Sequence, residues 1–199
     1  MQTYNYVNDF SLWFITGLEH IADLKGYDHI LFLLALCGVY TFQNWKNLLI
    51  LITAFTIGHS TTLVLSSFDI IRFSSKWVEF LIPLTIVITG LLNFNQPEKN
   101  KKRQWVNYAI ALFFGLIHGM GFANTIRFML ASSQSISIPL LGFNLGLEAG
   151  QIIVVALILT MAWLLVTKAR LNKKVWTNLL SVIAVITAVY FCIDRWPVP

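Results

Sequence analysis

The feature that most constrains this chain is a series of long apolar segments separated by short polar turns. A helix needs about 20 apolar residues to cross the hydrocarbon core of a bilayer. Of the 199 residues, 57% are hydrophobic and only 12% are charged, whereas about 25% of the residues of a soluble domain are charged. Seven candidate spans follow one another, at residues 6–22, 28–43, 45–67, 76–94, 105–125, 137–167 and 174–193. The sequence therefore predicts an all-α, polytopic membrane helix bundle of about seven transmembrane helices, with residues 1–199 as a single integral membrane domain.

Lysine and arginine residues are distributed unevenly between alternate loops of this predicted bundle. One side has five of them, and the other side has nine: Lys46, Lys99, Lys101, Lys102, Arg103, Lys168, Arg170, Lys173 and Lys174. Cytoplasmic loops carry the excess of positive charge, so seven crossings place the N-terminus in the cytoplasm and the C-terminus on the outer, periplasmic side. The net charge of +5 belongs to these loops and does not indicate a nucleic-acid partner.

All four histidines of the chain fall in the outer, periplasmic half of the bundle in this orientation. They are His20, His29, His59 and His118. Ionisable side chains at membrane depth are costly, so each one is a hypothesis for a functional site. Imidazole is the commonest protein ligand of transition metals. The sequence therefore predicts a site for a divalent transition metal, with nickel or zinc as the expected ion.

The first block of polar residues joins the first two predicted spans. His20 precedes a short turn that contains Gly26, and Asp28 and His29 follow it. Ligands from two helices can converge at such a turn. Asp28 also has an alternative role, because an acidic residue at the start of a helix can cap it and interact favourably with the helix dipole.

Two further histidines lie inside apolar spans, next to glycine. His59 follows Gly58, and His118 lies between Gly115 and Gly119. Glycine lets another helix approach closely, and neighbouring hydroxyl groups can orient an imidazole that binds a metal. The alternative for His59 is a helix-packing histidine bonded to a hydroxyl, and for the glycines it is close packing alone.

The sixth predicted span carries a carboxylate. Asn144, Glu148 and Gln151 are spaced i, i+4 and i+7, which places them on one polar face of a membrane helix. An unpaired carboxylate is costly at this depth. Glu148 is therefore expected either to lie beside a cation, such as a metal held by the histidines, or to be neutral and to hydrogen-bond between two helices.

Taken together, these four blocks resemble the HupE/UreJ family of bacterial hydrogenase and urease accessory membrane proteins. The matching stretches lie between about residues 17 and 151 and include Gly-Tyr-Asp28-His29-Ile-Leu-Phe, Thr-Ile-Gly-His59-Ser, Gly-Leu-Ile-His118-Gly-Met-Gly-Phe-Ala and Phe-Asn-Leu-Gly-Leu-Glu148. The resemblance implies a nickel permease whose metal ligands are His20, Asp28, His29, His118 and Glu148. Seven residues separate His20 from Asp28, two more than is usual in the family, so the position of His20 is the open question of this ligand set.

Three functions remain open at this point. The first is a transporter of Ni²⁺ or a similar ion, for which the inner halves of the spans offer no histidine, aspartate or glutamate as a stepping stone. The second is a membrane-embedded zinc-type hydrolase that acts on a lipid or membrane peptide from the periplasmic side, with His29, His59 and His118 as ligands and Glu148 or Asp28 as the base. The third is a structural or accessory subunit. A polar path inward would favour transport and a lateral groove would favour the enzyme, while homo-oligomers and accessory partner proteins are compatible with each.

Overall fold

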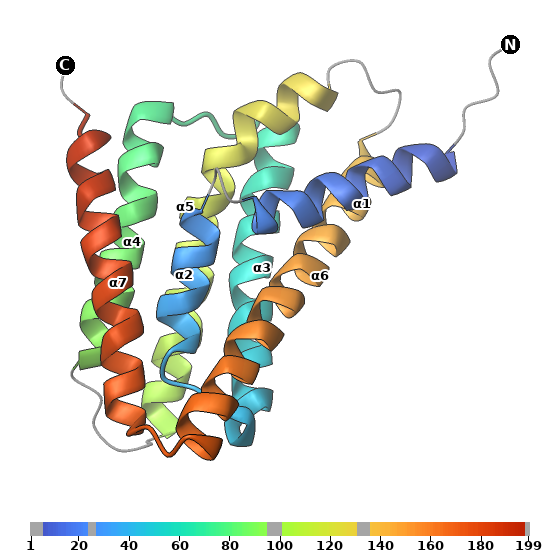
Figure 1. The fold of residues 1–199 in the computed structure, drawn as a ribbon. Coiled ribbons are helices and arrows are strands. Elements are labelled where there is room, and N and C mark those ends of the chain that lie inside the picture. Colours follow the sequence, from blue (N-terminus) through green and yellow to red (C-terminus); the bar gives the residue numbers. More distant parts are fainter. Residues whose placement is uncertain (1–5, 24–26, 95–100, 131–135, 198–199) are drawn as a thin grey trace, which may run out of the picture.

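The computed structural model describes residues 6–23, 27–94, 101–130 and 136–197, and these ranges contain helices and no strand (Figure 1). The all-helical prediction is confirmed. The α-helices of the described residues are α1 (Tyr6–Ala22), α2 (Asp28–Cys37), α3 (Trp45–Ser67), α4 (Ser75–Phe94), α5 (Lys101–Leu130), α6 (Ser137–Ala162) and α7 (Lys173–Asp194). A 3₁₀ turn, η1 (Phe42–Asn44), precedes α3, and a π-helical segment, η2 (Trp163–Lys168), extends α6.

Five segments of this fold are long and apolar enough to cross a membrane, whereas α1 and α2 are shorter. The five are Phe42–Ser67, Ser75–Phe94, Gln104–Met129, Ser137–Lys168 and Lys173–Asp194. The α2 helix has 10 residues, which at 1.5 Å per residue gives about 15 Å, half the thickness of the hydrocarbon core. The expected span at residues 28–43 is therefore incomplete, because its helix ends at Cys37 and the backbone is extended at Thr41.

The direction of α1 and α2 bears on the predicted topology. Figure 1 shows α2 running from the interior of the bundle toward the end at which α3 begins. The α1 helix begins toward the opposite end, where α7 finishes. Opposite sides for the two termini required seven complete crossings. This arrangement does not support them, since α1 runs obliquely across the upper part of the bundle and α2 has only 10 residues (Figure 1). Of the basic residues counted above, Lys25 and Lys99 lie outside the described residues, as do the side chains of residues 101–103.

The α3 and α5 helices pack against each other through glycines. A Cβ atom added to Gly58 would collide with the backbone of Leu112 and Leu116, and one added to Gly115 would collide with the backbone of Phe55. Gly115 meets Phe55, and Gly119, four residues later, meets His59. Because the contacts move toward the C-terminus on both helices, α3 and α5 are parallel. Neither Gly58 nor Gly115 leaves room for a side chain, which is the property expected of small residues at a membrane helix interface.

A second parallel pair is formed by α1 and α6. A Cβ atom added to Gly17 would collide with the backbone of Phe143, and one added to Gly146 would collide with the backbone of Phe14. The glycines at positions 142, 146 and 150 of α6 lie against the carbonyl groups of residues 10, 14 and 18 of α1. The α1 helix therefore lies along the first half of α6, in a register that the three glycines determine.

The short α2 helix lies inside the bundle, in contact with α4, α6 and α7. Its buried side chains include Leu31, Phe32, Leu33, Ala35 and Cys37. A helix that is apolar on all sides belongs in an interior. By contrast, the outward faces of the longer helices expose large apolar side chains such as Trp105, Leu157 and Ile186, which suits a surface in contact with lipid.

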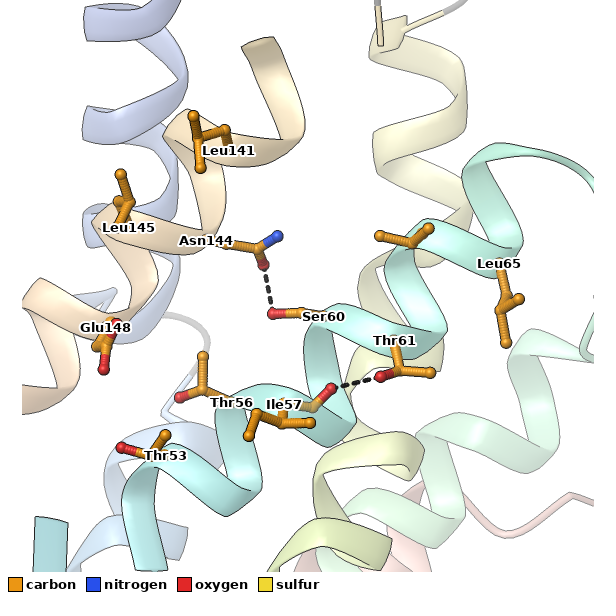
Figure 2. Close-up of a pocket in the computed structure, with 11 residues that line it drawn as sticks. Thr53, Thr56, Ile57, Ser60, Thr61, Leu65, Leu141, Asn144, Leu145 and Glu148 are labelled. Carbon is orange, nitrogen blue, oxygen red and sulfur yellow. Dashed lines mark hydrogen bonds between the residues drawn. The ribbon is translucent and has the colours of Figure 1, made fainter. Parts of the chain in front are cut away.

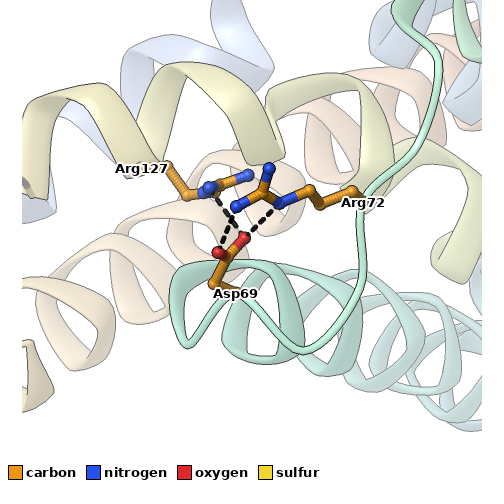
Figure 3. Close-up of polar contacts among 3 residues, drawn as sticks. All are labelled: Asp69, Arg72 and Arg127. Atoms are coloured by element: carbon orange, nitrogen blue, oxygen red, sulfur yellow. Dashed lines mark hydrogen bonds and ion pairs between the residues drawn. The ribbon is translucent and has the colours of Figure 1, made fainter.

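A charged cluster holds the loop between α3 and α4 (Figure 3). Asp69 follows α3 with a φ of 58°, in the left-handed region that aspartate tolerates better than most residues. Arg72 donates two hydrogen bonds to its carboxylate, at 2.7 and 2.5 Å, and Arg127 of α5 forms an ion pair with it at 2.7 Å. The hydrogen bond from Arg72, together with the positive charges of Arg127 and Arg72, lowers the pKa of the Asp69 carboxyl. The cluster therefore connects the end of α3 to α5.

Candidate metal centre

Three histidines from three helices meet in the interior of the bundle. His20 lies in the last turn of α1, His29 in the first turn of α2, and His59 in α3. One ring nitrogen from each lies within 4.8 Å of the other two, and the ring centres of His20 and His29 are 4.6 Å apart. Nitrogens bound to a tetrahedral metal at about 2.1 Å lie about 3.4 Å apart, so small side-chain rotations would bring these three to that geometry.

His118 of α5 joins this cluster. Its ring centre is 5.2 Å from that of His29, and its Nε2 lies 2.8 Å from the Thr85 hydroxyl of α4. The same hydroxyl donates to the carbonyl oxygen of Ile82 at 2.7 Å. Since a hydroxyl has one hydrogen, the bond to His118 requires that Nε2 carries the hydrogen and donates it, which leaves the lone pair on Nδ1 for a ligand.

Five imidazole nitrogens of this cluster are buried without a hydrogen-bond partner among the residues that the structure describes. They are His20 Nε2, His29 Nε2, both ring nitrogens of His59, and His118 Nδ1. The side chain of His59 is 0% exposed. A buried polar group without a partner costs about 1–3 kcal/mol, so several in one place indicate a site for a ligand. A transition metal ion fits this donor set, because imidazole nitrogens are among its preferred ligands.

A cavity of about 350 Å³ lies beside the cluster and carries charged side chains. Its lining includes His20, His29 and His118 together with Asp23, Asp28, Glu79 and Arg195. The Oδ2 atom of Asp28 accepts a hydrogen bond from Arg195 at 2.9 Å, whereas Oδ1 is buried and has no partner within the described part of the chain. Asp28 therefore presents one carboxylate oxygen to the cavity that the imidazoles line.

Aromatic rings enclose the histidines. The ring of Phe122 lies 4.3 Å from that of His20 and stacks on Phe143 at 5.0 Å. Phe32 and Phe55 lie 5.0 and 5.2 Å from His118. Such apolar walls limit access of water to the site and lower the local dielectric constant, which strengthens the interaction between an ion and its ligands.

Glu148 lies in a different place, an open groove between α3 and α6 (Figure 2). The groove has a volume of about 500 Å³. Ser60 of α3 donates to the side chain of Asn144 across it at 2.7 Å, and Thr56 donates to Gln151 at 2.6 Å. The predicted polar face of α6 therefore contacts α3, and Asn144 and Gln151 make these contacts.

The glycines of α6 explain the direction of Glu148. Each residue of a helix is rotated by about 100° from the one before it, so Glu148, two positions after Gly146, points away from α1. Among the described residues it belongs neither to the lining of the histidine cavity nor to the group of three nitrogens. The expected position of Glu148 beside the histidines is therefore not the one observed.

Most of the residues that meet here were expected from the sequence. His20, Asp28, His29 and His118 line one cavity, and His59 joins them through the group of three nitrogens. His20 lies in the last turn of α1 and lines this cavity although its spacing to Asp28 is long.

Thr85 and Arg195 were missed by the sequence analysis. A signal for Thr85 was present, since Thr85 and Thr89 are two hydroxyl residues one helical turn apart in an otherwise apolar span. No local pattern indicated Arg195, which comes from the far end of the chain. Its contact with Asp28 depends on the packing of α7 against α2.

Comparison with known proteins identifies a family. A family model described as "HupE / UreJ protein" matches residues 1–195. This match covers almost the whole chain and includes all four sequence blocks and the four histidines. No curated protein and no solved structure matches the chain.

Proposed function

The chain belongs to the HupE/UreJ family, and from this premise we propose that it is a multi-pass permease for nickel or a similar divalent transition metal ion. The observation that supports this most is the group of His20, His29 and His59, whose nitrogens lie within 4.8 Å of one another. In this proposal the ion is cargo, so the site has to capture it and then release it. Neutral imidazoles suit this task, because they bind nickel well without adding the negative charge of thiolates.

The proposed ligand set draws on both the cluster and the cavity. His20, His29 and His59 bind the ion first, and His118 offers a fourth nitrogen through Nδ1. The unpartnered Oδ1 of Asp28 supplies negative charge next to the site. Carboxylates that line a cavity attract cations, so Asp23 and Glu79 would favour entry of the ion. Glu148 is not included, since it faces the groove between α3 and α6.

The short helices support a topology in which α1 and α2 together make one broken crossing. With five long helices this gives six crossings, and both termini then lie on the same side. Lys46, Lys168 and Lys173 follow alternate crossings and lie at the end proposed to be cytoplasmic by the positive-inside rule. The cavity and both termini would face the periplasm, with the protein in the inner membrane as a single integral membrane domain. Broken helices at the middle of the membrane also form the ion sites of other transporters.

Uptake of radioactive nickel into proteoliposomes tests the permease. We expect the wild-type protein to exceed empty vesicles, and His29→Ala and His118→Ala to lose both uptake and bound metal. Thr187→Ala serves as a matched control, because this half-buried threonine of α7 donates a local bond to the Ile183 carbonyl of its own helix. No uptake above empty vesicles by folded wild-type protein would overturn the proposal.

One observation favours a second function, a zinc-type hydrolase. Asp28 places a carboxylate oxygen beside three histidines, an arrangement that could position a metal-bound water for general-base catalysis. The groove between α3 and α6 is less helpful to this alternative, because none of the histidines is among the residues that line it. Bound zinc without any nickel or zinc uptake would favour the hydrolase over the permease.

A further inference from the structure

The α4 helix carries a row of polar side chains that extends beyond the metal centre. Thr85, Thr89 and Asn93 are spaced four residues apart, so they lie on one face of the helix. All three are buried, although α4 is otherwise largely apolar. At 1.5 Å per residue the row extends about 12 Å along the helix, from the level of His118 toward the end of α4.

Polar groups of α2 and α7 face this row. The side-chain amide of Asn93 donates to the Ala35 carbonyl at 2.7 Å and to the Ser181 hydroxyl at 3.0 Å. Thr177, one turn before Ser181 on α7, donates to the Gly38 carbonyl at 2.8 Å. Five buried side chains therefore form a polar column between α2, α4 and α7, namely Thr85, Thr89, Asn93, Thr177 and Ser181.

Both ends of the polar column have a defined position. At one end the hydroxyl of Thr85 lies 2.8 Å from Nε2 of His118. At the other end the column reaches Gly38, the residue that follows α2. The last carbonyl groups of a helix carry partial negative charge, which attracts cations. The column thus leads from the histidines to the end of the bundle at which α3 begins (Figure 1).

We propose that this polar column is the inner half of the path along which the metal ion leaves the histidines. The inference rests on the permease function proposed above. Oxygen ligands hold nickel less tightly than imidazole nitrogens do, and conduction requires sites weak enough to release the ion. The hydroxyl and carbonyl oxygens exchange their present hydrogen bonds for contacts with the ion and its remaining water. This accounts for a path without histidine or carboxylate below the cluster.

Two conservative substitutions test the polar column. Thr89→Val and Ser181→Ala each remove a hydroxyl with little change in volume, and neither residue contacts the histidines. We expect each to lower the initial rate of radioactive nickel uptake into proteoliposomes at least tenfold, while the nickel content of the purified protein stays unchanged. Thr160→Val is the matched control and should keep wild-type uptake, because this hydroxyl is exposed and donates to the Ala156 carbonyl of its own helix.

The outcomes separate this inference from the permease proposal. Wild-type uptake rates in both column variants would overturn the column and leave the permease intact, whereas absence of uptake by wild-type protein would overturn both. If a variant does not fold, Thr89→Cys replaces it, in a transport-competent Cys37→Ala/Cys192→Ala background. Cd²⁺ added to this protein should block nickel uptake, and it should not block the Thr160→Cys protein. Unblocked uptake in Thr89→Cys would contradict the column.

Discussion

The α3–α5 and α1–α6 pairs pack in the same way but carry different chemistry. In each pair, a glycine of one helix packs against two backbone positions of the other helix. These two positions lie on either side of a glycine of that other helix, one of them three residues before it and one of them one residue after it. Gly58 packs against Leu112 and Leu116, which flank Gly115. Gly17 packs against Phe143 and Leu147, which flank Gly146. Both pairs are parallel, and Figure 1 shows that they run through the bundle in opposite directions. The same local geometry therefore appears twice, on segments whose sequences show no obvious repeat.

The two pairs differ in where their polar side chains lie. The α3–α5 pair buries His59 and His118 beside its glycines. The α1–α6 pair instead holds His20 at the end of α1 and directs Glu148 into the open groove. His20 lies in the last turn of α1, which has 17 residues, whereas His59 lies well inside α3, which has 23. Glycine contacts set the distance between helices, whereas the point at which a helix ends decides which side chains can meet.

The largest expected effect comes from closing the glycine contacts. Gly115→Ala should destabilise the protein by about 1–3 kcal/mol or more, because its Cβ would collide with backbone rather than with a movable side chain. Gly146→Ala should destabilise similarly, but it should weaken nickel binding less, since it displaces one histidine and Gly115→Ala displaces two. Thermal unfolding in detergent and nickel titration measure both effects.

Gly121→Ala is the control for this prediction. Its Cβ would meet the terminal methyl group of Ile82 at 2.7 Å, and that flexible side chain can move. Equal stability of the Gly115→Ala and Gly121→Ala proteins would show that the backbone contact of α3 and α5 is less close than described.

The next effect compares one histidine from each pair. We expect His59→Ala to weaken nickel binding by more than His20→Ala, and each by at least about tenfold. His20 lines the cavity, so water can take its place as a ligand, whereas His59 is fully buried. Isothermal titration with nickel measures the ranking, and a greater loss in His20→Ala would reverse the comparison.

A smaller effect is expected from the hydroxyl that orients a histidine of the α3–α5 pair. Thr85→Val should weaken nickel binding about tenfold without unfolding the protein, because Nε2 of His118 loses its acceptor. Thr89→Val removes the neighbouring hydroxyl and should leave the affinity unchanged. Identical nickel affinities in the two variants would show that the Thr85 hydroxyl does not orient His118 for nickel binding.

The smallest effect concerns the charged cluster that connects the end of α3 to α5. The pKa of Asp69 is lowered by Arg72 and Arg127, so folding gains stability from the ionised carboxylate above the unfolded pKa. This gain begins to decrease as the pH falls below about 4, where the unfolded chain takes up the proton, and it disappears as the pH falls through the lower pKa of the folded protein. Asp69→Asn should therefore lower the melting temperature slightly at pH 7, and this difference should shrink steadily as the pH falls below about 4. Asp194→Asn, at an exposed position on α7, is the control, and a pH-independent difference for Asp69→Asn would exclude the charge effect.

Several parts of this fold could be predicted from the sequence because they depend on local patterns. The apolar segments predicted helices, and the glycines at four-residue spacing on either side of His118 predicted a close helix contact such as that of Gly115. The end of α2 could not be predicted in this way, since the residues after Cys37 remain apolar enough to extend a span. Whether a helix continues there depends on the packing of α2 among α4, α6 and α7.

The candidate site was predicted in its residue types more fully than in its arrangement. The rarity of histidine in apolar spans identified all four imidazoles. The direction of Glu148 could also have been inferred, because two positions from Gly146 correspond to about 200° of rotation. That inference requires knowing that the glycines face α1, which is a contact between distant segments. Arg195 illustrates the same limit, since its bond to Asp28 joins residues that are 167 positions apart in the sequence.

The ten-residue length of α2 has an electrical consequence. An ion at the histidines lies one short helix, about 15 Å, from the end of the bundle at which α3 begins. A membrane potential would therefore act on it over about half of the hydrocarbon thickness. For a divalent ion this amounts to about 2.3 kcal/mol per 100 mV, which favours inward movement over that half of the path. We expect an inside-negative potential to accelerate nickel uptake into vesicles oriented as in the cell, and equal rates at zero potential would argue against a voltage-driven step.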